Sequence, residues 1–312
     1  MNGIELDDVV KLSPLESAGR AGGARAEGRD AVTDSAPAPA PPHFVIEASV
    51  GWQFPELGEL WRYRELLYFM VWRDIKSRFK QTALGVTWII LQPVLTMIVF
   101  TLFLGRLAGV PSEGAPYPIY TFAALLPWQL FAHALSQSGT SLVNNRDLLT
   151  KVYFPRLVIP LSSVLVGLVD FVLAFAVLLV MMVFYGVVPT AAVLALPLLV
   201  LLACATSFSL GLWLAVLNVR YRDVRYTIPF LLQFWLIATP IAYPASLVPE
   251  RWRMLYALNP MVGVVDGFRW ALIGTPDTLH PSAFISIGVV TVLLIGGLLY
   301  FRRMERTFAD EV

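Results

Sequence analysis

The stretch 157-LVIPLSSVLVGLVDFVLAFAVLLVMMVFYGVVPTAAVLALPLLVLLACATSFSLGLWLAVLNV-219 decides the fold of this chain. It carries one charged residue, Asp170, and the sequence Gly186-Val187-Val188-Pro189 interrupts it near the middle. A helix needs about 20 apolar residues to cross the hydrocarbon core of a bilayer. The stretch is therefore too long for one crossing and long enough for two, with a turn at the glycine and proline.

Four further uncharged runs surround this stretch: Gln81–Gly105, Gly114–Asn145, Tyr226–Pro249 and Thr278–Phe301. Hydrophobic residues make up 57% of the chain and charged residues 14%, against about 25% charged in an average soluble domain. The alternation of a membrane β-barrel is absent, so each run is expected to be a helix that satisfies its own backbone. We predict an all-α membrane protein whose residues 81–312 form a domain of six transmembrane helices.

Basic residues set the expected orientation, because they favour the cytoplasmic side of short loops. Fifteen lie before the first span, in alternate loops and in the tail: Arg62, Arg64, Arg73, Lys76, Arg78, Lys80, Arg146, Lys151, Arg156, Arg220, Arg222, Arg225, Arg302, Arg303 and Arg306. The opposite loops hold four: Arg106, Arg251, Arg253 and Arg269. Both termini are therefore predicted to be cytoplasmic.

The region before the first span divides into two parts. Residues 1–43 are rich in Ala, Gly and Pro, which predicts a disordered cytoplasmic arm. Residues 44–80 contain an amphipathic helix over 56–80, with Trp and Phe on one side and basic residues on the other. Such a helix is expected to lie in the headgroup region; the alternative is a helical extension of the first span.

A second amphipathic helix is expected in the loop between the second and third spans. Asn144 or Asn145 can cap it, Asp147 suits its first turn, and Pro155 ends it. Its apolar side chains need a surface to cover, either lipid headgroups or the groove of a partner. The residues of this loop are Asn144, Asn145, Arg146, Asp147, Leu148, Leu149, Thr150, Lys151, Val152, Tyr153 and Phe154.

The segment from Arg251 to Pro276 is too apolar for an ordinary external loop. Pro260 breaks it, because the residue before a proline avoids helical geometry. Two half-helices that meet at Asn259-Pro260 predict a re-entrant helical hairpin before the last span. Two helices lying flat on the outer surface are the alternative.

Asp170 is the one acidic residue within a predicted span, and an intramembrane charge points to function. It either takes part in proton coupling or makes a hydrogen bond between helices; His133 and Cys204 stand alone in other spans. The chain has no glycine-framed phosphate loop, no metal-binding motif and no nucleophile motif. We therefore expect a non-catalytic chain with no metal site, and no nucleic-acid partner.

The chain carries an ordered set of short motifs. In chain order they are Arg78–Trp88 (RFKQTALGVTW), Leu91-Gln92-Pro93, Leu126-Pro127-Trp128, Lys151–Arg156 (KVYFPR), Asn218–Asp223 (NVRYRD), Pro240–Pro244 (PIAYP) and Leu258–Met261 (LNPM). This set resembles the ABC-2-type permeases of polysaccharide exporters, which serve O-antigen, capsule and teichoic acid. The resemblance extends from about Leu57 to the carboxyl end.

The resemblance implies a membrane subunit that exports lipid-linked polysaccharide, most of all O-antigen, across the cytoplasmic (inner) membrane. It implies a homodimer bound to two copies of a separate ATPase subunit, on which ATP and Mg²⁺ reside. The loop of residues 144–154 then corresponds to the coupling helix that docks on the ATPase.

The resemblance also implies two further sets of site residues. The candidate outer gate comprises Trp252, Tyr256, Asn259, Pro260, Phe268 and Trp270. The candidate glycan path, between protomers, comprises Trp88, Phe100, Phe230, Phe234, Trp235 and Tyr243. Aromatics in spans also serve simply for packing or face lipid.

Two other functions remain open at the level of sequence. An ABC-2-type exporter of a small lipid or drug would share the six spans and the coupling loop. A proton-coupled secondary transporter would need a carboxylate relay and usually an internal repeat, and neither is visible here.

Overall fold

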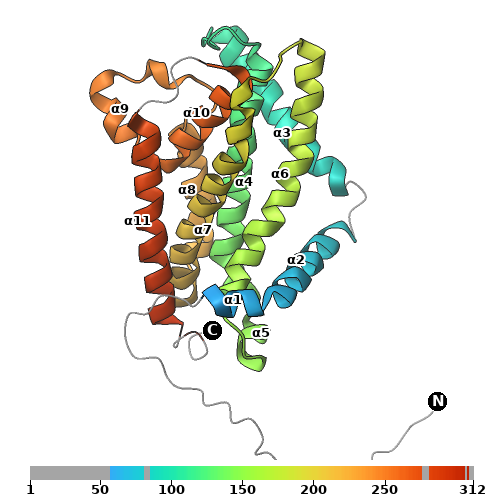
Figure 1. The fold of residues 1–312 in the computed structure, drawn as a ribbon, viewed down its shortest axis with the longest axis vertical. Helices are drawn as coiled ribbons and strands as arrows, with labels where there is room; N and C mark the ends of the chain where they lie inside the picture. The colour runs from blue at the N-terminus through green and yellow to red at the C-terminus, as the bar shows by residue number, and fades with distance from the viewer. Residues whose placement is uncertain (1–56, 81–84, 276–280, 306–307, 309–312) are drawn as a thin grey trace, which may run out of the picture. The chain divides into compact units, whose positions relative to one another are not determined.

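Every regular element in the described part of this computed structural model is a helix (Figure 1). The structure describes residues 57–80, 85–275, 281–305 and 308, so the expected arm of residues 1–43 lies outside it. The α-helices are α1 (Leu57–Arg62), α2 (Arg64–Phe79), α3 (Gly85–Phe100), α4 (Tyr117–Asn144), α5 (Arg146–Lys151), α6 (Val158–Tyr185), α7 (Leu196–Arg220), α8 (Val224–Ile237), α9 (Glu250–Tyr256), α10 (Pro260–Ile273) and α11 (Pro281–Met304). A π-helix (Thr101–Leu107) continues α3, and 3-10 turns cover Ala191–Ala195 and Ala245–Leu247.

Four helical stretches in the described residues are long and apolar enough to cross a membrane: Thr87–Leu107, Val158–Tyr185, Ala191–Arg220 and Phe284–Met304. They coincide with four of the six predicted spans. The predicted helix over Tyr226–Pro249 is wrong in its extent, because α8 has 14 residues and ends at Ile237. At 1.5 Å per residue this helix is about 21 Å long, shorter than the hydrocarbon core of about 30 Å.

The central helix, α4, has 28 residues but is less apolar than these four stretches. It contacts α3, α6, α7, α8 and α10, and most of its residues are buried within the chain. Some of its polar groups bond within the protein: the Ser141 hydroxyl donates to the Ser138 carbonyl, and the Asn218 amide of α7 donates to the Gly139 carbonyl. Among the described residues, the buried hydroxyls of Tyr120 and Ser138 make no hydrogen bond. A helix that faces other helices can be more polar than one that faces lipid, which explains the difference.

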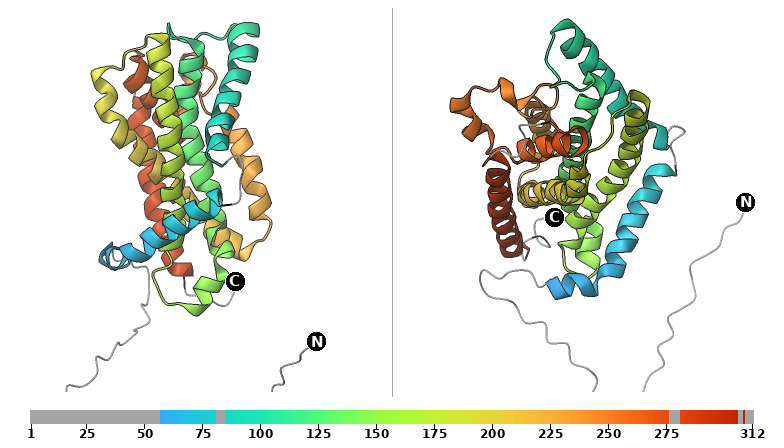
Figure 2. Two further views of the ribbon diagram at one scale, coloured as in Figure 1. Left: turned by 90° about the vertical axis from the view of Figure 1, so that its right-hand side faces the viewer. Right: turned by 45° about the horizontal axis from the view of Figure 1, so that its top comes forward.

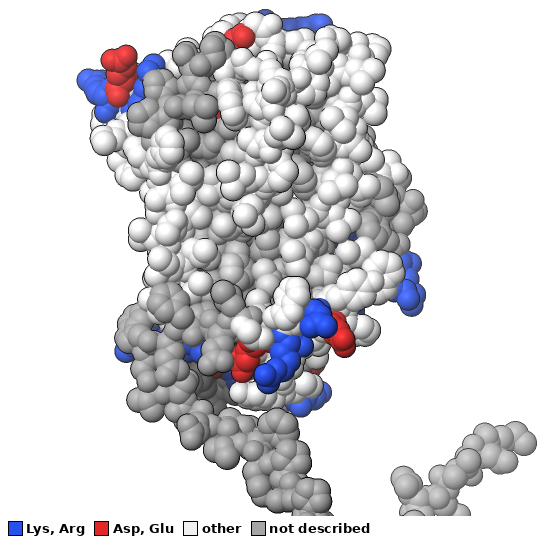
Figure 3. Space-filling model, in the orientation of Figure 1, with Lys and Arg blue, Asp and Glu red and all other residues white. Residues whose placement is uncertain are grey.

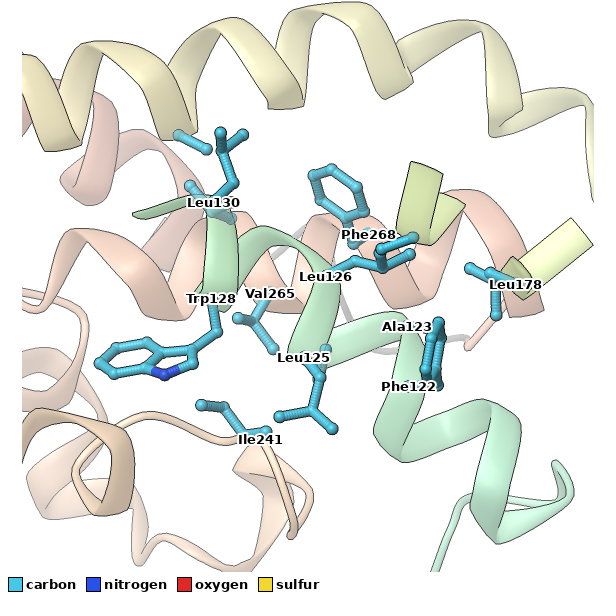
Figure 4. Close-up of a cluster of buried hydrophobic side chains, with 14 of the residues drawn as sticks. Phe122, Ala123, Leu125, Leu126, Trp128, Leu130, Leu178, Ile241, Val265 and Phe268 are labelled. Atoms are coloured by element: carbon cyan, nitrogen blue, oxygen red, sulfur yellow. The ribbon is translucent and has the colours of Figure 1, made fainter. Parts of the chain in front are cut away.

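Large apolar side chains of α4 form the main core of the molecule. Figure 4 shows Leu126 of α4 beside Phe268 of α10 and Phe122 of α4 near Leu178 of α6, and all four belong to one buried cluster. Trp128, one to two turns further along α4, packs its ring on Phe131 at 5.4 Å between centroids. This core joins α10 to the long helices, so α10 is enclosed by protein.

The two ends of the helix bundle differ in what they carry. Figures 1 and 2 place α2, α5 and the carboxyl-terminal end of α11 at one end, which we call the α5 end, and α9 and α10 at the other, the α10 end. On the face drawn in Figure 3, Lys and Arg gather near both ends and the band between them is almost uncharged. Such a band is what a membrane-embedded chain presents to hydrocarbon.

The predicted amphipathic helix over residues 56–80 is present as two helices, α1 and α2, with a break at Tyr63. Met70 of α2 is buried, and α2 contacts α6. The large aromatic side chains of Trp61, Tyr68 and Trp72 are exposed. The helix pair thus has one side on the bundle and an aromatic side that is free to meet lipid.

The close approach of α4 and α7 supplies a test of the packing. A Cβ added at Gly211 of α7 would lie 2.7 Å from the Cβ of Ser138 on α4, and neither helix can yield without disturbing the core. We expect Gly211→Ala to lower the stability of the purified protein by about 1–3 kcal/mol through overpacking. Thermal unfolding in lipid nanodiscs measures this effect.

The matched control is Gly288→Ala in α11, where an added Cβ meets nothing within 4 Å. There the better helix propensity of alanine is expected to raise stability by about 0.5–1 kcal/mol. Equal effects of the two substitutions would show that the contact of α4 with α7 does not limit packing.

Candidate functional site

The loop between α4 and α6 is tied to α2. Arg73 of α2 donates from Nη2 to Oδ1 of Asn145 at 3.0 Å, and Asn145 donates from Nδ2 to the Ser141 carbonyl at 2.9 Å. Asn145 occupies the N-cap position of α5, but its side chain makes these bonds and does not cap the helix. The amphipathic helix expected over residues 144–154 is shorter than predicted, since α5 ends at Lys151 and Val152 is extended.

The same loop exposes only part of its apolar surface. The side chains of Leu149 (5% exposed) and Phe154 are buried against the chain's own core, with Met70 and Leu142 in the same cluster. Tyr153 is 73% exposed, and Val152 is exposed beside it. The surface left for a partner is therefore Val152 and Tyr153 rather than the whole apolar side of the loop.

A second tie at the α5 end comes from the linker between α5 and α6. Arg156 donates to the backbone carbonyl of Glu305, just after α11, and its guanidinium lies 5.8 Å from the ring centre of Phe308. Arg302 forms a 2.8 Å ion pair with Glu305. The loop with Tyr153 is thus anchored both to α2 and to the end of α11.

At the α10 end the predicted break at Asn259-Pro260 is confirmed, since α9 ends at Tyr256 and α10 begins at Pro260. Asn259 is the N-cap of α10, and its Oδ1 accepts from the Met261 backbone at 3.1 Å. The same oxygen accepts from Trp235 Nε1 at 2.9 Å, and Nδ2 donates to Thr239 Oγ1 at 3.0 Å. One side chain therefore joins the start of α10 to the end of α8.

Arg269 of α10 holds the irregular backbone that follows α8. Its side chain is 1% exposed and donates to the carbonyls of Ile241 (2.6 Å), Tyr243 (3.4 Å) and Tyr120 (3.4 Å). Its guanidinium lies 3.7 Å from the ring centre of Tyr120, and Asp266 is 3.9 Å away. The carbonyls of Ile241 and Tyr243 lie outside any helix and would lack helical partners, and a fully buried guanidinium supplies the donors that they need.

Tyrosines complete this junction. The hydroxyl of Tyr243 donates to the Ile237 carbonyl at 2.8 Å and lies 3.0 Å from the hydroxyl of Tyr256, while Tyr117 donates to the Ala242 carbonyl at 2.6 Å. Burial, reinforced by the hydrogen bond to Tyr243, raises the pKa of Tyr256 above its ordinary value. Tyr256 therefore acts as a neutral hydrogen-bonding group.

The residues of the candidate outer gate lie in this junction and around it. Asn259, Pro260 and Tyr256 form its turn, and Phe268 packs in the main core. Trp270 is half-buried against that core, whereas Trp252 on α9 is exposed.

The structure divides the six candidate glycan-path aromatics into two groups. Trp88 of α3 and the pair Phe230 and Phe234 of α8, with ring centres 4.6 Å apart, are exposed. Phe100 is partly buried, Trp235 packs edge-on against Phe131 at 5.1 Å, and Tyr243 is engaged as described above. Only the first group offers free aromatic faces within this chain.

A polar cluster that the sequence did not predict brings together Arg78, His133 and Asp170 from α2, α4 and α6. Arg78 Nη1 lies 2.5 Å from Asp170 Oδ2, and Arg78 Nη2 lies 2.6 Å from His133 Nε2. His133 Nε2 is 3.9 Å from Asp170 Oδ2, so the expectation that His133 stands alone is wrong. Because a guanidinium only donates, His133 accepts through Nε2 and carries its proton on Nδ1.

These contacts join groups that lie 37 to 92 residues apart along the chain, and no local motif signals them. The one available signal was Asp170 itself, since a carboxylate within a span needs a partner. Of the two roles left open for Asp170, the geometry favours the bond between helices, because Arg78 occupies the carboxylate.

Comparison with known proteins gives the class of the chain. The family model described as ABC-2 type transporter matches residues 65–273, from the first turn of α2 to the end of α10. The chain therefore belongs to the ABC-2 type transporter family.

Individual relatives show which members of this family the chain is similar to. The chain is 34% identical over 259 residues to the O-antigen export system permease protein RfbA of Myxococcus xanthus, covering 81% of this chain and 98% of that protein. It is 28% identical over 250 residues to the protein of the same name in Klebsiella pneumoniae, covering 79% and 94%. The polysialic acid transport protein KpsM of Escherichia coli is 23% identical over 245 residues, covering 75% and 91%.

Arg269 provides a test of the junction at the α10 end. Replacement by Met keeps most of the apolar stem but removes every donor, which leaves Asp266 and the two non-helical carbonyls of Ile241 and Tyr243 without their partner. We expect Arg269→Met to lower stability by about 3 kcal/mol or more, read as the thermal unfolding midpoint in nanodiscs. Arg253→Met on α9 is the control, because Arg253 is much more exposed and its loss is expected to cost below about 1 kcal/mol. A midpoint for Arg269→Met equal to that of the control would contradict this account.

Proposed function

We propose that this chain is the permease subunit of an exporter of lipid-linked polysaccharide in the cytoplasmic (inner) membrane. O-antigen is the substrate that we favour. The observation that carries the proposal is the 34% identity to an O-antigen export permease over 98% of that protein's length. Four candidate membrane spans and membership of the ABC-2 type transporter family support it. An exporter of a small lipid or drug in the same family is the alternative.

The helices support a topology of six crossings with both termini cytoplasmic. α3, α4, α6, α7 and α11 supply five, and α8 with the irregular segment after it supplies the sixth. The α5 end would face the cytoplasm, because the loops and helix ends there carry most of the basic residues. The enclosure of α10 by α4, α7 and α11 favours a re-entrant hairpin over a helix lying flat on the outer surface.

Partners follow from the family and from the surfaces that the chain leaves uncovered. The exposed apolar faces of α3 and α8, with Trp88, Phe230 and Phe234, support a homodimer with the glycan path between protomers. A separate ATPase subunit, in two copies with ATP and Mg²⁺, would supply the energy. The exposed Val152 and Tyr153 would meet that subunit at the α5 end.

The structure gives little support to a proton-coupled mechanism. Asp170 is held by Arg78, and the accepting nitrogen of His133 is occupied by the same guanidinium. A relay would need at least one of these groups free to exchange a proton. The cluster is better explained as a tie between α2, α4 and α6.

Deletion of the gene for this chain in its host tests the proposed function. We expect surface polysaccharide to disappear, lipid-linked polysaccharide to accumulate inside the cell, and the wild-type gene to restore export. The purified chain alone is expected to hydrolyse no ATP and to support hydrolysis only with its ATPase subunit. Unchanged surface polysaccharide in the deletion strain would refute the proposal.

The docking surface has its own test in Tyr153→Asp. A charge at an exposed apolar contact is expected to remove at least about 2 kcal/mol of binding, or roughly 30-fold in affinity for the ATPase subunit. Co-purification of the two subunits measures the loss, and the amount of folded permease should be unchanged.

Leu149→Asp is the comparison variant for Tyr153→Asp, because it places the same charge on the buried side of the same loop. Because Leu149 packs in the chain's own core, this change is expected to reduce the yield of folded permease before any partner is added. If Tyr153→Asp keeps full affinity for the ATPase subunit, Tyr153 does not lie at the docking surface.

A further inference from the structure

A cavity of about 740 Å³ lies beside the cluster of Arg78, His133 and Asp170. Residues of α3, α4 and α6 form most of its wall, and Leu236 of α8 contributes one side chain. Small-molecule sites have volumes of about 300–1,000 Å³. The cavity is therefore large enough for a ligand, and it lies within a single protomer.

The wall of this cavity is more polar than the helices that form it. Gln92 of α3 with Gln129 and Gln137 of α4 line it. Within the described part of the chain their side-chain amides make no hydrogen bond, although the backbone carbonyls of Gln92 and Gln137 accept from threonine hydroxyls. An amide without a partner is costly in hydrocarbon. Gln129 is half-buried, and Gln92 and Gln137 are exposed, so the three amides border one open cavity that is suited to water or a polar ligand.

The charges beside the cavity indicate whether a polar ligand there would be charged or uncharged. Arg78 is paired with Asp170 at 2.5 Å, and the neutral His133 accepts from the same guanidinium. The cluster therefore carries no net positive charge, and the carboxylate would repel a phosphate or another anion. An uncharged ligand with many hydroxyl groups fits better, because amides, imidazole and carboxylate all exchange hydrogen bonds with hydroxyls.

Aromatic side chains complete the wall. Trp128 of α4 is almost fully buried on the inner side, while Trp88 of α3 is largely exposed. Indole rings offer an apolar face with a polar edge. A pyranose ring has the same division, with C–H groups on its faces and hydroxyls around its rim.

We propose that this cavity, walled by α3, α4 and α6 of one protomer, binds a short segment of saccharide through Gln92, Gln129 and Gln137 and the two tryptophans. The inference rests on the proposed function and adds a contact site inside each protomer to the path between protomers. Arg78 and Asp170 shape one side of the site by holding α2 against α6.

Binding of lipid-free polysaccharide tests this site. The probe is the host's own O-polysaccharide, released from its lipid by mild acid and titrated calorimetrically against the full chain in nanodiscs. Gln129→Leu removes an amide that lacks a protein partner, and we expect it to weaken binding roughly threefold to tenfold for each hydrogen bond lost.

A matched pair of threonines supplies the control. Thr96 lines the cavity, whereas Thr291 of α11 does not. Each hydroxyl donates to the carbonyl four residues earlier in its own helix: Thr96 to Gln92 at 2.9 Å and Thr291 to Ile287 at 2.8 Å. Thr96→Val is expected to weaken polysaccharide binding about threefold, and Thr291→Val to leave it unchanged. If Gln129→Leu fails to fold, the threonine pair alone decides.

The outcomes separate this inference from the proposed function. Equal binding by wild type, Thr96→Val and Thr291→Val would place the saccharide elsewhere and overturn the site. So would binding of inorganic pyrophosphate in place of polysaccharide, since the cavity would then be an anion site. Either result leaves the proposed function intact if the deletion strain loses export, whereas normal export in that strain refutes the function itself.

Discussion

The requirement that backbone carbonyls find donors inside the protein governs the α10 end of this molecule. α8 stops at Ile237, well short of a bilayer's thickness, and the chain continues as irregular backbone toward α9. Arg269 and Tyr117 donate to carbonyls of that backbone, and Asn259 and Tyr243 donate to groups at its start and at the end of α8. Irregular backbone is tolerated at membrane depth where protein encloses it or where it lines a water-filled cavity. Because Arg269 and Asn259 bond to the segment after α8, the position of α10 and the path of that segment depend on each other.

The sequence predicted those elements that arise from local physics. Long uncharged runs had to become helices, because an unpaired backbone is too costly in lipid, and α3, α6, α7 and α11 follow. The helix break at Asn259-Pro260 was predictable for the same kind of reason, since a proline constrains its immediate neighbour.

Features that depend on contacts across the fold were not predictable. The early end of α8 has no breaker before Pro240 and is stabilised by Asn259, 22 residues after Ile237. The inward orientation of Leu149 depends on Met70 and Leu142 beneath it. The cluster of Arg78, His133 and Asp170 joins three helices, and composition could identify the carboxylate but not its partners.

The division of the α4–α6 loop into a buried and an exposed side has a consequence for how such exporters diversify. Leu149 and Phe154 can change only together with the helices that they contact, whereas Val152 and Tyr153 touch little of their own chain. Under the docking proposed above, selection on folding and selection on partner choice would act on different residues of one short segment. A duplicated copy of this gene would then acquire a new ATPase subunit through surface substitutions alone, and ATPase subunits could be exchanged between exporters without redesign of the membrane domain.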